Sequence, residues 1–137
     1  MKTFMKHVTA ILIALVMSQS VYAEDVTLSS GSWVEKGYSI KGEWNIVDRD
    51  GSRILIFNDN FKTKNGPDLK VYFSSRNISK IRGADVDRLS IKIGELKSNK
   101  GYQEYVIPED LDLTEYGTVL IHCEAYAHLW GGADTKL

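Results

Sequence analysis

The chain contains 137 residues, 43% of them hydrophobic, with 17 basic and 18 acidic side chains and a formal net charge of −1. This length fits one globular domain. The balanced charge removes the electrostatic basis for nucleic-acid binding, which needs clustered Lys and Arg. The sequence also contains no GxSxG, HExxH, P-loop or CxxCH signature, so no motif assigns an enzymatic reaction.

The first 23 residues have the pattern of a secretory signal peptide. A start with two lysines is followed by the largely apolar residues 8–17 and by a Val-Tyr-Ala site at residues 21–23. The apolar stretch is too short for a membrane span, which takes about 20 residues. We therefore expect cleavage before Glu24, a periplasmic or secreted location, and no stable membrane insertion after cleavage. The remaining residues, 24–137, are expected to form a single domain.

This predicted domain contains one cysteine, Cys123. An exported protein with a single thiol cannot form an internal disulfide. Three interpretations stay open from the residues themselves: a buried and inert small hydrophobe, a redox thiol or metal ligand, and a disulfide to another chain.

Short alternating stretches broken by turn residues run through the rest of the chain. This pattern is typical of an all-β fold and predicts an antiparallel β-sandwich or flattened barrel. The expected strands cover residues 32–35, 38–47, 54–57, 69–73, 89–96 and 102–107, with turns at Asp50-Gly51, 65–68 and Lys100-Gly101.

Two stretches lack such a pattern. Residues 74–87 are polar, with Gly83 among them, and predict an exposed surface loop. Residues 109–116 follow Pro108 and predict a short helical turn or a wide loop before Gly117.

Residues 118–130 divide into two faces with a period of two. One face carries Val119, Ile121, Cys123, Ala125, Ala127 and Leu129, and the other carries Leu120, His122, Glu124, Tyr126, His128 and Trp130. If this stretch is one long final strand, Cys123 points into the core and both histidines point away from it. A bulge within the stretch would reverse part of this assignment.

His122, Glu124 and His128 share one face of that predicted strand. A straight strand separates the two histidines by about 20 Å, so it cannot bring both to one metal ion. We expect solvated or interface residues here rather than a metal site. The aromatic residues of residues 24–137 are expected to pack in the core and on the sheets, with a carbohydrate or flat-cofactor surface as the alternative.

Several of these stretches together resemble the DM13 domain family. The resemblance covers residues 31–133 and rests on the order and spacing of GPDLKVYFS (66–74), IGELK (93–97), GYQEYVIP (101–108), TVLIHC (118–123) and WGGA (130–133).

The resemblance implies an extracytoplasmic electron-transfer module. Cys123 matches the late cysteine of the family, which would act as a bare redox thiol or as the ligand of a prosthetic group such as haem. A redox partner protein or a small ligand is the implied partner. The family usually has Trp before this cysteine, where this chain has His122. The alternative is a non-catalytic extracytoplasmic binding or structural module in which Cys123 is buried and inert.

Overall fold

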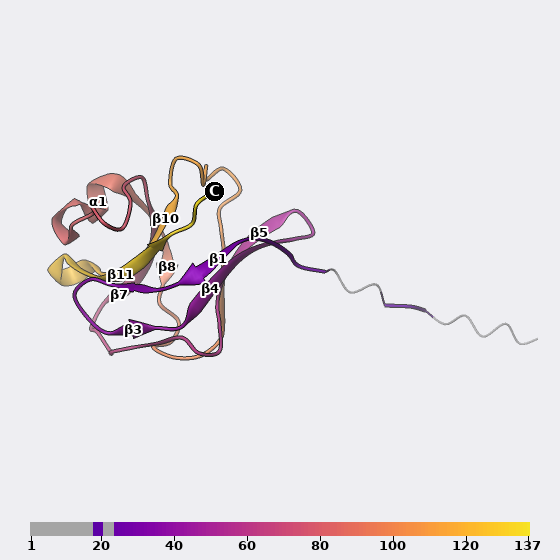
Figure 1. Cartoon of the computed structure of the whole chain (residues 1–137), viewed down its shortest axis with the longest axis horizontal. Coiled ribbons are helices and arrows are strands. Elements are labelled where there is room, and N and C mark those ends of the chain that lie inside the picture. The colour runs from indigo at the N-terminus through magenta and orange to yellow at the C-terminus, as the bar shows by residue number, and fades with distance from the viewer. Residues whose placement is uncertain (1–17, 21–23) are drawn as a thin grey trace, which may run out of the picture.

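The computed structural model describes residues 18–20 and 24–137, so the predicted signal peptide falls largely outside the described residues. The described strands form two antiparallel sheets that face each other, together with a two-stranded ribbon (Figure 1). The sheets do not close into a barrel, which confirms the predicted all-β sandwich. Among the described residues, no helix has the length and apolar character needed to cross a membrane.

The first sheet has four strands in the order β1-β4-β5-β9. Their bounds are Val26–Ser32, Glu43–Arg49, Ser52–Phe57 and Gln103–Val106. Asp50 and Gly51 join β4 to β5 with positive φ angles of 52° and 83°. Two consecutive residues with positive φ define the tight turn that matches the twist of paired strands, so the predicted hairpin is confirmed.

The second sheet has five strands in the order β2-β11-β10-β7-β8. Their bounds are Val34–Glu35, His128–Asp134, Thr118–Cys123, Leu69–Ser74 and Ser90–Glu95. The ribbon pairs β3 (Ile40–Lys41) with β6 (Lys62–Thr63). The predicted strand over residues 38–47 is therefore divided, because Gly42 adopts a φ of 100° and lies against the backbone of Asn60, where a Cβ would have no room.

The main core lies between the two sheets. Inward side chains of β4, β5, β7, β9 and β10 meet there with the aromatic residues of the connecting segments. Trp33 packs edge-on against Phe57, with 4.7 Å between the ring centroids, and Phe61 contacts both rings. Aromatic rings of this kind bury a large apolar area, which supports a core without disulfides in a domain of this size.

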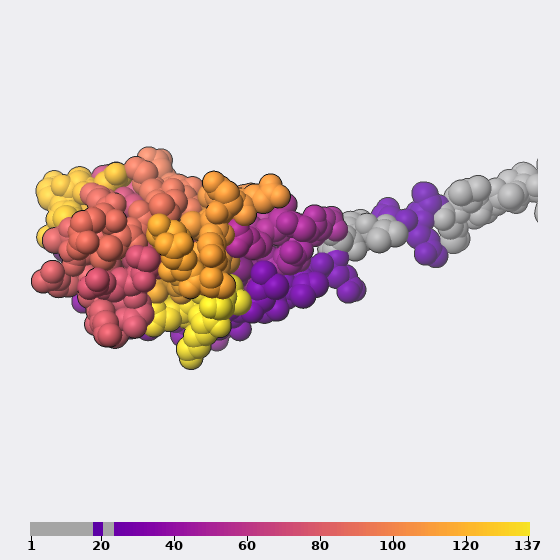
Figure 2. Space-filling view, turned by 90° about the horizontal axis from the view of Figure 1, so that it is seen from above, coloured from indigo at the N-terminus to yellow at the C-terminus, as the bar shows by residue number. Residues whose placement is uncertain are grey.

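A second apolar cluster lies on the outer face of the five-stranded sheet. Residues 75–89, here called the cover segment, contain the 3-10 helix η1 (Gly83–Asp85) and the helix α1 (Val86–Leu89). The segment buries Ile78, Ile81 and Val86 against Leu120. The expected surface loop over residues 74–87 is confirmed in part: polar residues such as Arg76 and Lys80 are exposed, but the stretch also contains short helical turns and docks its few apolar residues on the sheet. Figure 2 shows this stretch, in salmon, at the end of the domain opposite the β4–β5 hairpin, in purple and magenta.

The predicted final strand is instead a hairpin. β10 ends at Cys123, the 3-10 helix η2 (Glu124–Tyr126) reverses the chain, and β11 begins at His128. Ala127 closes the turn in the left-handed conformation with a φ of 49°. The inward positions of β10 agree with the prediction, but beyond the turn the faces change: Leu129 joins the outer cluster and Trp130 the main core.

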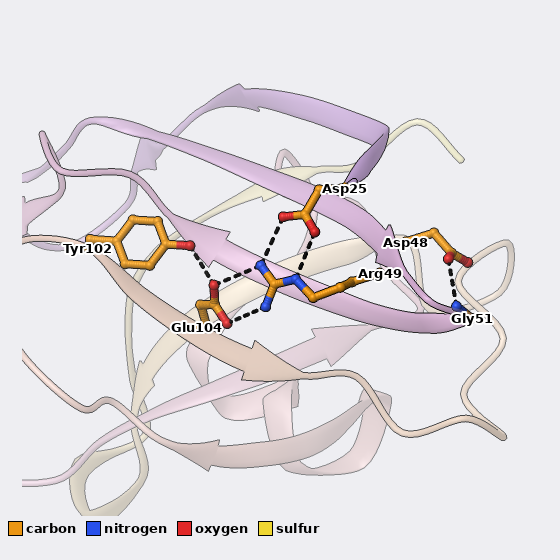
Figure 3. A network of polar contacts seen from close by, with 6 residues as sticks. All are labelled: Asp25, Asp48, Arg49, Gly51, Tyr102 and Glu104. Carbon is orange, nitrogen blue, oxygen red and sulfur yellow. Dashed lines mark hydrogen bonds and ion pairs between the residues drawn. The ribbon is translucent and has the colours of Figure 1, made fainter. Parts of the chain in front are cut away.

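A network of charges crosses the outer face of the four-stranded sheet (Figure 3). Arg49 on β4 forms paired hydrogen bonds with Asp25, just before β1, and with Glu104 on β9. Glu104 also accepts a hydrogen bond of 2.5 Å from the Tyr102 hydroxyl. The network shares this face with the buried side chains of Val47, Ile54 and Ile56 and connects the two edge strands of the sheet.

Candidate functional site around Cys123

Cys123 lies at the end of β10 with its side chain in the main core. Only 1% of the residue is exposed, and it belongs to the same cluster as Ile121 and Trp130. Its neighbours in register are Leu69 on β7 and His128 on β11. Because facing residues of paired strands share a face, the Leu69 side chain covers the thiol on the β7 side. The inward orientation predicted for Cys123 agrees with this position.

The turn after Cys123 is held by contacts with distant parts of the chain. The backbone N–H of Glu124 donates to the carbonyl of Asp68, at 3.1 Å. The Glu124 carboxylate pairs with Lys92 on β8, at 2.9 Å. These contacts tie η2 to β7 and β8 and thus fix the position at which β10 ends.

A surface cleft of about 450 Å³ adjoins the Cys123 site. It is formed by residues 65–70 and 95–99, and Leu69 is one of its lining residues. Leu69 is also the register partner of Cys123 and a member of the same core cluster, so it belongs both to the lining of the cleft and to the surroundings of the thiol. The backbone N–H of Leu96 donates to the Leu69 carbonyl, at 2.9 Å, which holds the two sides of the cleft together.

Charged side chains at this cleft neutralise one another. Lys70 pairs with Asp68 at 2.9 Å and with Glu95 at 2.8 Å. Its ammonium group holds the pKa of both carboxyl groups below their usual range, and the carboxylates raise the pKa of Lys70. The lining of the cleft is therefore mainly polar, with paired charges at Asp68, Lys70 and Glu95 and a few apolar residues such as Leu69 and Leu96.

His122 lies on the opposite side of the sheet from Cys123. It is 1% exposed and packs edge-on against Tyr72, with 5.6 Å between the ring centroids. Its Nδ1 atom has no hydrogen-bond partner among the described residues, and burial lowers the pKa of the imidazole. The expectation of a solvated or interface residue is wrong for His122, because the cover segment encloses this face. It holds for His128, which is exposed.

The two histidines and Glu124 do not form a metal site. Within the part of the chain that the structure describes, no group of three His, Cys, Asp or Glu side chains is placed to hold a metal ion. The chain reversal at η2 brings His128 beside Cys123 in register, while His122 pairs with Leu129.

The residues around Cys123 do not fit a haem. The thiol is packed among core side chains and lines neither the cleft at Leu69 nor the larger cleft at Tyr38 described below. His122, the adjacent imidazole, faces the other side of the sheet. A haem at Cys123 would have to displace core residues such as Leu69 and Trp130. The packing favours a bare thiol over a haem ligand.

Sequence reasoning missed two features of this region. The first is Leu69 as the residue that covers the thiol, which follows from strand pairing and leaves no signal in a single sequence. The second is a cleft of about 550 Å³ between residues 36–38, 81–84 and 127–129. Gly37 and Gly83 were its available signals, because glycine is favoured where two backbone segments approach each other closely.

The fold and the site together define an all-β sandwich with one thiol buried at the end of a central strand. A family model described as "Electron transfer DM13" matches residues 32–134, which include Cys123. The chain therefore belongs to the DM13 electron-transfer domain family. No curated protein matches the chain, and no solved structure matches it either.

Proposed function

We propose that this protein is a periplasmic or secreted electron-transfer module that acts through Cys123. The observation that carries the proposal is the match to the electron-transfer family over three quarters of the chain, together with Cys123 as the only cysteine available for redox chemistry. The pattern of a signal peptide in residues 1–23 supports the extracytoplasmic location.

The environment of Cys123 favours chemistry at a bare thiol. The thiol belongs to a core cluster of hydrocarbon and aromatic side chains, and Leu69, its register partner, also lines the neighbouring cleft. A redox partner protein therefore reaches the thiol only if Leu69 or the η2 turn moves. Such gating would restrict the exchange of electrons to a partner that docks at this end of the sheet.

Thiol–disulfide exchange with glutathione disulfide tests this proposal. The Cys123 thiolate would attack one sulfur of the probe, form a mixed disulfide and release one glutathione thiol, and an excess of glutathione would reverse the step. We expect one such adduct per folded wild-type chain and none in Cys123→Ser or Cys123→Ala. Ile121→Val is the matched control, because it changes the next inward residue of β10 conservatively and should keep the adduct. The proposal fails if the folded wild-type protein forms no adduct or if both cysteine variants still form one.

Absorption spectra with added haem test the fit to a prosthetic group. A bare thiol predicts no absorption band that depends on Cys123, with or without haem. A haem band that disappears in Cys123→Ser and persists in Ile121→Val would contradict the packing argument. It would instead favour Cys123 as the ligand of a prosthetic group.

A second candidate is a non-catalytic binding or structural module in which Cys123 is inert. The 1% exposure of Cys123 supports it, since free cysteines in apolar surroundings usually act as small hydrophobic residues. Thiol labelling separates the two candidates. Labelling that needs complete unfolding favours the inert thiol, whereas labelling by local opening of the native protein favours the redox module.

A further inference from the structure

The cleft between residues 36–38, 81–84 and 127–129 lies outside the Cys123 site and is lined by basic, aromatic and apolar side chains. Its volume is about 550 Å³, within the range of small-molecule pockets. Three segments build it: the turn after β2, η1 with the residues before it, and the start of β11. In Figure 1, η2 and the segment that carries α1 lie together at this end of the molecule.

Two glycines hold the walls of this cleft together. A Cβ at Gly83 would collide with the backbone oxygen of Ala127, and a Cβ at Gly37 would lie 2.7 Å from that of Leu129. The obstacles are backbone atoms, which cannot rotate away as a side chain can. The cover segment and the turn after β2 therefore rest directly on the start of β11, and the cleft exists before any ligand binds.

The turn at residues 36–38 is fixed as well. The backbone N–H groups of Lys36, Gly37 and Tyr38 all point to the carbonyl of Trp130, at 3.0, 3.1 and 3.4 Å. The Tyr38 ring stacks on Trp130, with 3.8 Å between the centroids and 24° between the planes. Tyr38 nevertheless remains 37% exposed, so a rigid aromatic surface is available at the cleft.

The basic side chains that line the cleft are Lys36, Arg82 and His128, and none of its lining residues within 18–20 and 24–137, the part of the chain that the structure describes, carries a carboxylate. Arg82 uses its Nε to donate to Asp85, at 3.1 Å, and its side chain is 79% exposed. Its terminal nitrogens therefore stay accessible to a ligand. Lys36 adds a second permanent positive charge, which makes the cleft attractive to anions.

We propose that this cleft binds a small organic anion with a flat apolar body. The anionic group would face Lys36 and Arg82, whose guanidinium suits carboxylate and sulfonate oxygens. The flat body would lie at Tyr38 over the apolar floor made by Ile81 and Leu129. Neither contact uses Cys123, so this binding stands or falls independently of the electron-transfer proposal.

A pair of fluorescent probes of similar shape and different charge tests the charge requirement. The anionic probe is 1-anilinonaphthalene-8-sulfonate, and the neutral one is N-phenyl-1-naphthylamine. We expect saturable binding of the anionic probe that weakens with added salt, and binding of the neutral probe at least about fivefold weaker. Equal affinities for the two probes, or no saturable binding of the anionic one, would overturn the proposal.

A double substitution locates the site. Lys36→Gln with Arg82→Gln removes both permanent charges, and we expect it to weaken the anionic probe at least about fivefold. The matched control is Arg76→Gln with Lys80→Gln. This pair removes two exposed positive charges that lie on the cover segment but outside the cleft. Equal loss in both double variants would refute the assignment. Thermal unfolding of each variant verifies that the proteins are folded, because this probe also binds partly unfolded states.

Backbone amide shifts in NMR give an independent readout of position. The anionic probe should shift the amides of residues 36–38, 82–84 and 127–129 in the wild-type protein. Shifts confined to another part of the molecule would overturn the proposed site even if the affinity follows the charge of the probe.

Discussion

The imidazole of His122 is enclosed by the sheet and the cover segment, and no residue in the described part of the chain forms a hydrogen bond with its Nδ1 atom. A buried imidazolium would lose its hydration, so burial favours the neutral ring and lowers the pKa of His122. Asp87 and Glu124 act in the opposite direction through their negative charges, while His128 adds to the lowering. The Tyr72 hydroxyl donates a hydrogen bond to the Asp87 carboxylate, at 3.4 Å, so this carboxylate already has a partner other than His122.

The pH dependence of stability should therefore carry a contribution from His122. In the unfolded chain the imidazole binds a proton below about pH 6.5, whereas the folded protein resists protonation until a lower pH. The contribution of the neutral His122 to the free energy of unfolding is therefore fully present above about pH 6.5 and is lost as the pH falls below this value toward the lowered pKa of the folded protein. We expect His122→Phe to reduce this loss, measured as the unfolding midpoint in denaturant at several pH values.

His128→Gln is the matched control for this measurement, because it removes the exposed histidine from the same hairpin. The interpretation is wrong if His128→Gln flattens the pH profile as strongly as His122→Phe. It is also wrong if the wild-type protein becomes more stable as the pH falls through this range.

Access to the Cys123 thiol should depend on Leu69. Leu69→Ala shortens a side chain that shares the core cluster of the thiol and lines the cleft, so we expect native-state labelling of Cys123 to become faster. Leu129→Ala is the matched control, since both leucines are 8% exposed but Leu129 lies in the outer cluster. Each substitution should cost about 2–5 kcal/mol of stability.

The labelling rate must be compared at equal stability, because global unfolding exposes the thiol in every variant. Faster labelling of Leu69→Ala than of an equally destabilised Leu129→Ala supports access through the cleft. Equal rates would show that the thiol is reached by global unfolding instead.

Among the elements, β1 is attached to its sheet by a charge contact as well as by backbone pairing. Arg49 lowers the pKa of both Asp25 and Glu104, mainly through its side-chain hydrogen bonds. Lowered carboxyl pKa values contribute stability above the ordinary pKa of these groups, and the contribution is lost as the pH falls through the lowered values. The attachment of β1 is therefore strongest near neutral pH.

Substitution of Arg49 should loosen β1 selectively. In Arg49→Gln we expect faster hydrogen exchange of the β1 amides, unchanged exchange of the β10 amides, and a rise of the Asp25 and Glu104 pKa values toward their usual range. NMR measures all three. Arg76→Gln, a change of an exposed arginine outside the network, should alter none of them. Uniform acceleration across both sheets would contradict a local role for Arg49.

The docking of the cover segment should depend on Gly83. Gly83→Ala places a methyl group against the backbone of Ala127, and strain of this kind costs about 1–3 kcal/mol. Gly94→Ala is the matched control, because a Cβ at Gly94 meets nothing within 4 Å and its φ is not positive. Chemical denaturation should show a loss of stability for Gly83→Ala and little change or a small gain for Gly94→Ala. A similar loss in both variants would contradict the close-approach argument.

Some elements could be predicted because their signals are local. The Asp50-Gly51 turn between two apolar runs requires only two residues with positive φ. The reversal at η2 has no such signal: the residues Glu-Ala-Tyr-Ala contain no Gly, Pro, Asn or Asp. Its turn is held by Asp68 and Lys92, which come from other strands. Alternation alone therefore continued the predicted strand through residues 124–127.

For the whole molecule, the proposal of export makes a direct prediction about the mature N-terminus. Cleavage after residue 23 would leave Asp25 as the second residue, in place to contact Arg49. We expect the exported protein to begin at Glu24, as measured by N-terminal sequencing or intact mass. A mature chain that begins beyond Asp25 would contradict the predicted site, and a chain that keeps residues 1–23 would contradict cleavage.

The alternation along residues 118–123 was sufficient to place Cys123 on an inward face, because period two depends only on the backbone of a strand. The same alternation could not decide that the opposite face is buried too. That outcome depends on the cover segment, which docks Ile78, Ile81 and Val86 on the outer face of the sheet and encloses His122. Which face of a sheet meets water is decided by what packs on it. Contacts between residues far apart in the chain made that decision here.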